Sequence, residues 1–108
     1  MWYNQISVFP NISGVGGSLQ EFYLHGNRIT SVPDAAFDNM QRLRYLLLSD
    51  NQLTVFPIIR AISQTLIHLN LKQNLLTSIP DNYFNNLHRL KYLELNDNHL
   101  PVFPDEHE

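Results

Sequence analysis

A pattern of spaced leucines closed by an asparagine recurs along the chain and constrains its fold more than any other feature. Residues 66–80 carry it as LIHLNLKQNLLTSIP. Leu69 and Leu71 alternate with polar residues as in a short strand, and Asn74 follows where such a strand would end. A buried carboxamide has two donor hydrogens and an acceptor oxygen, so it can satisfy backbone groups where the chain leaves a strand. We therefore expect stacked copies to form an asparagine ladder.

The ladder positions recur at separations of 23, 24, 23 and 24 residues. They are Asn4, Asn27, Asn51, Asn74 and Asn98. Residues 4–50 and 51–97 are identical at 21 of 47 aligned positions, which is more than a shared hydrophobic pattern requires and indicates internal duplication. We divide the single domain, residues 1–108, into a partial repeat at 1–18, repeats at 19–42, 43–65 and 66–89, and a partial repeat at 90–108.

Each repeat is expected to supply one short parallel strand, a turn and a return segment. Such a unit buries its leucines only against neighbouring units, so the stack itself forms the core. A hydrophobic residue and a proline follow each ladder position, as in Ile79-Pro80, and the fixed φ of proline ends regular pairing. In the outer segments we expect short helical turns at 37–40 and 84–87 and a flexible turn at 14–17.

Together with the LxxLxLxxNxL pattern, the segments VPDAAFDNMQRL and IPDNYFNNLHRL resemble the leucine-rich repeat family. Their (V/I)PxxxFxxLxxL portion is similar to the 24-residue "typical" subclass of extracellular animal arrays, such as those of Toll, Slit and chaoptin-like proteins. The resemblance covers residues 4–104. It implies an α/β-type solenoid, a right-handed superhelix with short parallel strands on its concave face and irregular or 3₁₀ segments on its convex face. Because the chain lacks cysteine-rich caps, we expect it to be a fragment of a longer array.

Charge and residue content argue against several classes of function. A formal net charge of −3 gives nucleic acid little to bind, and no apolar run is long enough to span a bilayer. The five histidines occupy unrelated repeat positions without a metal-ligand spacing. No GxSxG-like motif is present, and the carboxylates fall at positions expected to be solvated. We predict no enzyme, no metal, no cofactor, no nucleic-acid partner and no direct membrane insertion.

Residues that alternate with the inward leucines are expected to face the concave surface, because successive strand side chains point to opposite faces. They form columns of Glu21, Tyr45, His68 and Tyr92, of Tyr23, Leu47, Asn70 and Glu94, and of His25, Ser49, Lys72 and Asn96. Exposed tyrosines supply rigid contact area with a polar tip. The predicted ligand-binding residues are Tyr23, Tyr45, Leu47, His68, Asn70, Tyr92 and Glu94. The alternative interpretation is that the aromatic residues only support their column neighbours.

These features favour a protein-binding module for extracellular adhesion or receptor-type recognition, located outside the cell or at its surface. The alternatives are a structural spacer, an intracellular adaptor in the cytoplasm, or a bacterial effector. The triplet Asn11-Ile12-Ser13 would accept an N-linked glycan at Asn11 in a secreted protein. Because a repeat exposes its apolar cross-section when a neighbour is missing, we also expect end-to-end self-association of uncapped repeats.

Overall fold

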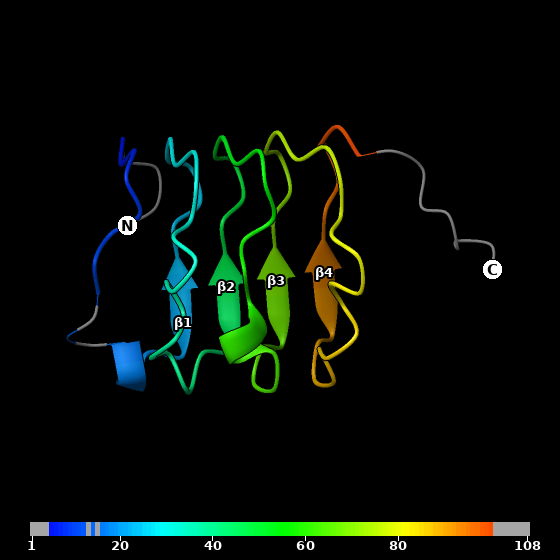
Figure 1. The fold of residues 1–108 in the computed structure, drawn as a ribbon. Helices are drawn as coiled ribbons and strands as arrows, with labels where there is room; N and C mark the ends of the chain where they lie inside the picture. Colours follow the sequence, from blue (N-terminus) through cyan, green and yellow to red (C-terminus); the bar gives the residue numbers. More distant parts are fainter. Residues whose placement is uncertain (1–4, 13, 15, 101–108) are drawn as a thin grey trace.

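The computed structural model describes residues 5–12, 14 and 16–100. In this part of the chain four parallel strands form one sheet in the order β1-β2-β3-β4 (Figure 1). The strands are β1 (Glu21–Tyr23), β2 (Tyr45–Leu47), β3 (His68–Asn70) and β4 (Tyr92–Glu94), and the 3₁₀ helices are η1 (Gly16–Ser18) and η2 (Arg60–Ile62). The order of the strands in space is their order in sequence. This is the arrangement of a solenoid, in which each repeat contacts its neighbours.

The register between strands is set by the repeat length. Tyr45 of β2 lies opposite Glu21 of β1 and His68 of β3, which are 24 residues earlier and 23 residues later. Backbone pairing continues beyond the strands, since the N–H of Leu24 donates to the carbonyl of Leu47 at 2.9 Å. The alternating period therefore keeps equivalent positions in line across the sheet.

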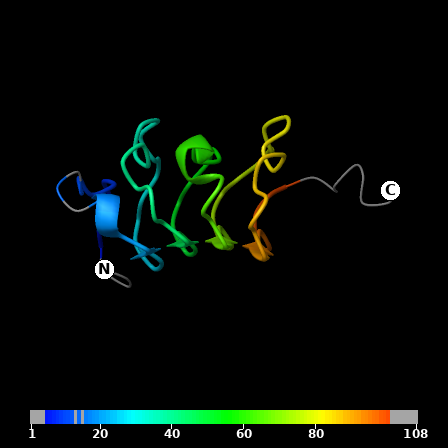
Figure 2. The same cartoon turned by 90° about the horizontal axis from the view of Figure 1, so that it is seen from below.

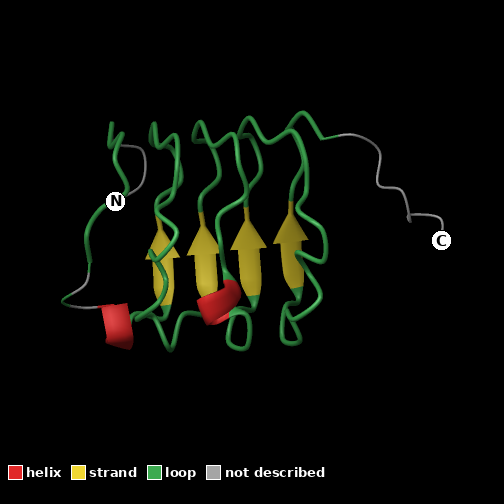
Figure 3. Ribbon diagram, in the orientation of Figure 1, coloured by secondary structure: helices red, strands yellow, loops and turns green. Residues whose placement is uncertain are grey.

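The core lies between the sheet and the return segments. Leu46 and Leu69, at the centres of β2 and β3, are fully buried, as are Leu48 and Leu71 just beyond those strands. Figure 2 shows the strands along one side and the loops along the other, and Figure 3 shows that loops make up most of that outer layer.

Truncating a leucine such as Leu46 to alanine would cost about 2–5 kcal/mol, because the stack cannot collapse around the lost methyl groups.

Aromatic side chains fill the space between the core leucines and the outer segments. Phe9 meets Phe37 edge to face, with ring centroids 5.8 Å apart. Phe56, the duplicate of Phe9, meets Tyr83 with centroids 4.9 Å apart, and the Tyr83 hydroxyl donates to the carbonyl of Pro57 at 2.5 Å. Burial raises the pKa of Tyr83 above its usual value, so the hydroxyl keeps its proton and this hydrogen bond.

A line of asparagine side chains joins each repeat to the one before it. The Asn51 amide donates to the carbonyls of Leu24, in the preceding repeat, and Leu48, in its own, both at 3.0 Å. Its Oδ1 accepts the N–H of Ile29, also in the preceding repeat, at 3.0 Å. Asn74 makes the same set of bonds one repeat later. The described ladder consists of Asn27, Asn51, Asn74 and Asn98, and Asn4 lies outside the described residues.

The residue before each ladder asparagine has a left-handed backbone. These residues are Gly26, Asp50, Gln73 and Asp97, with φ of 77°, 57°, 56° and 62°. Glycine adopts this conformation without a steric penalty, whereas a side chain such as that of Gln73 costs on the order of 1–2 kcal/mol. Aspartate tolerates this conformation, so the backbone strain at the turn before the ladder is greatest at Gln73.

The outer segments differ in part from the sequence-based expectation. Residues 37–40 and 84–87 each form the expected short turn, in which the N–H of Met40 donates to the Phe37 carbonyl at 3.1 Å and that of Leu87 to the Phe84 carbonyl at 3.3 Å. The 3₁₀ helices lie in the alternate repeats, at η1 and η2. Gly16, expected in a flexible turn, is buried in η1, where an added Cβ would stand 3.6 Å from Met40 Cγ. The prediction of a flexible turn was therefore wrong at this position.

The far edge of β4 is more open than the interior of the stack. Leu93 is 40% exposed, whereas Leu46 and Leu69 at equivalent positions are 0% exposed. Leu93, Leu95 and Leu100 line a groove beside this edge. Val15 of the expected turn at 14–17, and residues 101–104 of the stretch that resembles the family, lie outside the described residues.

Replacing Asn51 with leucine should destabilise the protein, because the buried Ile29 amide loses its acceptor. The carbonyls of Leu24 and Leu48 each lose one of two donors and keep Asn27 and Asn74 respectively. Each buried polar group left unpaired costs about 1–3 kcal/mol, so we expect the free energy of unfolding to fall by at least that amount. Denaturant unfolding followed by circular dichroism measures the loss. Asn86→Leu, at an exposed asparagine, is the matched control and should change stability by less than about 0.5 kcal/mol. An equally small effect of Asn51→Leu would contradict the role of the ladder.

Candidate functional site

The residues predicted to bind a ligand lie together on the sheet face opposite the core. Each strand is three residues long and turns its central side chain inward, so its first and third side chains point to the other face. The pairing register brings these side chains into two rows that cross all four strands. We call this surface the open sheet face; it consists of Glu21, Tyr23, Tyr45, Leu47, His68, Asn70, Tyr92 and Glu94.

Three rings stand in line across β2, β3 and β4. The His68 ring centroid is 6.2 Å from that of Tyr45 and 5.6 Å from that of Tyr92, with interplanar angles of 58° and 57°. Exposure increases toward β4: Tyr45 is half-buried, whereas Tyr92 is 60% exposed. Tilted rings at this separation attract one another and hold each other in place. We call Tyr45, His68 and Tyr92 the aromatic row.

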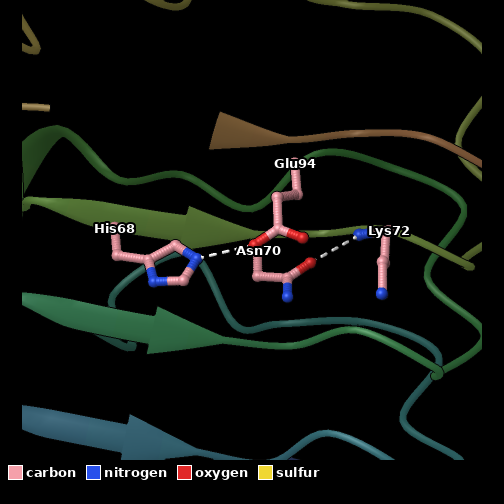
Figure 4. Close-up of polar contacts among 4 residues, drawn as sticks. All are labelled: His68, Asn70, Lys72 and Glu94. Carbon is pink, nitrogen blue, oxygen red and sulfur yellow. Dashed lines mark hydrogen bonds and ion pairs between the residues drawn. The ribbon is translucent and has the colours of Figure 1, made fainter. Parts of the chain in front are cut away.

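A polar cluster of His68, Asn70, Lys72 and Glu94 adjoins the aromatic row (Figure 4). His68 Nε2 lies 2.9 Å from Glu94 Oε2, and the two side chains are 21% and 39% exposed. Asn70 is buried, and its Oδ1 accepts the backbone N–H of Lys72 at 3.1 Å. A partly exposed pair of this kind contributes at most about 1 kcal/mol to stability. Its main consequence is to fix the orientation of the His68 ring between the two tyrosines.

Tyr23 is oriented by Glu21 at the β1 end of the face. Its hydroxyl donates to Glu21 Oε1 at 3.0 Å, and its ring centroid lies 6.3 Å from that of His25. Partial burial, with smaller effects of the hydrogen bond and the negative charge of Glu21, raises the pKa of Tyr23 above its usual value. Tyr23 and its neighbour Leu47 are both half-buried, so this end of the face offers less accessible surface than Tyr92.

The third predicted column is not available as a continuous binding surface. Ser49 is buried, and its carbonyl accepts the N–H of Gly26 at 3.0 Å. The carbonyl of Lys72 accepts the N–H of Asp50 in the same way, also at 3.0 Å. These positions lie where the chain turns toward the ladder, so part of the column serves backbone pairing. Asn96, in the last described repeat, is the exposed member.

The sequence predicted which residues share this face, but it did not predict how exposed each side chain is. Leu47 was among the predicted ligand-binding residues but is half-buried, whereas Tyr92 is the most accessible aromatic of the row. Asn70 was expected to contact a ligand, yet it is buried and bonded to the backbone. Asn11, the candidate glycan acceptor, has an exposed side chain, and Ser13 of its triplet lies outside the described residues.

Metal-ligand clusters and membrane-spanning helices are both absent from the described part of the chain. Across residues 5–12, 14 and 16–100, no group of three histidine or carboxylate side chains converges in a way that could hold a metal ion. In the same ranges no helix is both long enough and apolar enough to cross a membrane. The open sheet face offers aromatic surface, one ion pair and a carboxylate.

Comparisons with known proteins identify the family. The leucine rich repeat profile matches residues 17–58 and 63–106. Lumican of Rattus norvegicus and lumican of Oryctolagus cuniculus are each 43% identical over 49 residues, which is 45% of this chain and 14% and 24% of theirs. The solved structure of a leucine-rich repeat protein of Leptospira interrogans superposes with a TM-score of 0.82 at 33% identity, over 96% of this chain and 26% of that one.

This chain thus spans only about a quarter or less of the length of each of these relatives. The match of the family profile extends over most of the 108 residues, in two consecutive blocks. The solved relative shares the same stack of parallel strands over nearly the whole chain. With one strand, buried leucines and one ladder asparagine in each of the repeats 19–42, 43–65 and 66–89, the chain belongs to the leucine-rich repeat family.

Proposed function

We propose that this chain is a non-enzymatic module that binds a protein ligand through the open sheet face, in extracellular adhesion or receptor-type recognition. The observation that carries the proposal is the aromatic row, which ends in Tyr92 at 60% exposure. Rigid aromatic side chains with polar tips supply contact area at low entropic cost and recur at interface hot spots. The core does not require these rings, because Leu46 and Leu69 fill it from the same strands.

The polar cluster would give such an interface its specificity. Glu94 Oε2 is held by His68, while Oε1 has no hydrogen-bond partner among the described residues. A carboxylate oxygen in this position can accept a hydrogen bond from an N–H or cationic group of a ligand. Charged groups beside an aromatic patch select partners by complementarity more than they add affinity.

The extracellular part of the proposal rests on the similarity of residues 32–43 and 79–90 to the "typical" repeat subclass and on the exposed Asn11 of the glycosylation triplet. A cytoplasmic adaptor would use the same face without a glycan. A structural spacer is the alternative of a different class. The spacer alternative predicts that substitutions on the open sheet face leave every interaction of the parent protein unchanged.

Tyr45→Ala and Tyr92→Ala test the binding role of the aromatic row. The ligand is first isolated from the native source by affinity capture on the full-length parent protein. Surface plasmon resonance then measures the Kd of each variant for that ligand. We expect each substitution to weaken binding by about 1–2 kcal/mol, or roughly tenfold, because it removes a ring from the centre of the contact. Tyr92→Phe separates the contribution of the hydroxyl from that of the ring.

Arg60→Ala, at an exposed position in η2 on the outer side, is the control for this series. It should change the Kd by less than about twofold, as expected for a side chain remote from a hot spot. A larger effect of Arg60→Ala than of either tyrosine substitution would move the interface to the outer segments. No effect of any of these substitutions would support the spacer.

We further propose that the edge of β4 associates with a second copy of the chain. Leu93 is 40% exposed there, and within the described residues β4 pairs with β3 alone. An unpaired strand edge that is flanked by apolar side chains can pair with the strand of a second molecule. Light scattering of the 108-residue chain should therefore show a mass that rises with concentration, and Leu93→Lys should suppress the rise. A monodisperse monomer across the whole series would rule this association out.

A further inference from the structure

A second polar surface lies at the edge of the sheet where the strands begin. There a groove of about 380 Å³ is lined by Arg42, Arg44, Arg89, Gln20, Gln41 and Thr65. Ile67 is the one apolar side chain of the lining. This surface, the basic groove, is distinct from the open sheet face, although Arg44 immediately precedes Tyr45 of the aromatic row. Gln20, Arg44 and Ile67 of its lining immediately precede β1, β2 and β3, whose arrows are labelled in Figure 1.

The backbone at this edge is already paired, so the chemistry of the groove comes from its side chains. The N–H of Arg44 donates to the carbonyl of Gln20 at 2.9 Å, and the carbonyl of Arg44 accepts the N–H of Ile67 at 2.7 Å. The N–H of Lys91 donates to the carbonyl of Ile67 at 2.8 Å, which places Lys91 in the same row one repeat further along. Arg44 and Lys91 therefore lie in one row of paired backbone along this edge, and Arg42, Arg44 and Arg89 line the groove.

These positive charges have no partner within the described part of the chain. Arg42, Arg44 and Arg89 are exposed, and none forms an ion pair with a described carboxylate. Glu21, which pairs with Tyr45 next to Arg44, accepts the hydroxyl of Tyr23 instead. The chain as a whole carries a net charge of −3, so the groove is a local concentration of positive charge on an acidic protein. Like charges held together are unfavourable unless a counter-charge offsets them.

The basic positions are present in both copies of the internal duplication. Arg42 and Arg89, and likewise Arg44 and Lys91, are 47 residues apart in sequence, which is the period of the duplication. Their repeats are two strands apart in the sheet, and two inter-strand spacings amount to about 10 Å. An extended peptide covers this span in about three residues.

We propose that the basic groove binds an acidic segment of a protein, whose carboxylates pair with Arg42 and Arg44 at one end and with Arg89 at the other. Guanidinium groups match carboxylates in a bidentate geometry. Gln20, Gln41 and Thr65 offer the donors and acceptors that a peptide backbone requires. A long polyanion suits the site less well, because the acidic remainder of the protein would repel the parts that extend beyond the groove. The proposal stands on the groove alone and is tested without the ligand of the open sheet face.

The test uses octaglutamate as the probe and the ¹⁵N-labelled 108-residue chain. At low salt, octaglutamate should shift the Nε–Hε resonances of Arg42, Arg44 and Arg89. Arg28 and Arg60, which are exposed elsewhere on the chain, serve as internal controls. Their Nε–Hε resonances should not shift. Raising the sodium chloride concentration to physiological ionic strength should weaken the effect, because exposed charges are then screened beyond about 8 Å.

Paired variants separate the groove from general charge attraction. Arg42→Gln with Arg89→Gln should weaken octaglutamate binding by about fivefold or more, whereas Arg28→Gln with Arg60→Gln should change it by less than about twofold. Circular dichroism verifies that both variants fold, which their exposed positions favour. Equal shifts at all five arginines would overturn the proposal. So would groove binding of a heparin-derived oligosaccharide or inorganic phosphate in the absence of octaglutamate binding.

Discussion

The asparagine ladder is the contact on which the order of the stack depends. Burial of leucines such as Leu46 drives neighbouring repeats together but is non-directional, so it does not by itself fix their offset. The ladder adds direction, because Asn51 bonds carbonyls of its own repeat and of the preceding one and also accepts the Ile29 amide. A one-residue slip would break these bonds and turn the leucines outward. The chain accepts a strained left-handed backbone at Gln73 just before the next ladder position.

Fixed register makes a surface from residues that are far apart in sequence. Tyr45, His68 and Tyr92 come from three different repeats and form one row because their strands are paired in line. The basic groove arises in the same way, since Arg42 and Arg89 belong to the two copies of the duplication and line one groove. Both surfaces therefore depend on contacts between repeats. A substitution that loosens the stack would disturb the aromatic row and the basic groove even if it lies outside both.

The period of the sequence was enough to predict the strands, their order and the inward leucines, because each of these follows from local alternation and equal repeat length. The remaining features depend on side-chain packing, which the repeat period does not specify. Gly16 is buried in a 3₁₀ helix close to Met40, and no local signal in the glycine-rich segment indicated that contact. The alternation of side chains predicted which face Ser49 points to, but it did not predict that neighbouring repeats bury this residue. The basic groove was not predicted, because alternation along the strands carries no information on side chains that precede them, although the 47-residue separation of Arg42 and Arg89 is visible in the sequence.

Hydrogen exchange at the Leu53 amide, compared between the native chain and Asn74→Ala, tests the central role of the ladder most directly. In the structure this amide donates to Asn74 Oδ1 at 3.0 Å, and the Ile29 amide, which donates to Asn51, provides the internal reference. If the ladder fastens neighbouring repeats, Asn74→Ala should lower the protection of Leu53 by at least about tenfold more than that of Ile29. Equal loss of protection at both amides, or none at either, would contradict the account.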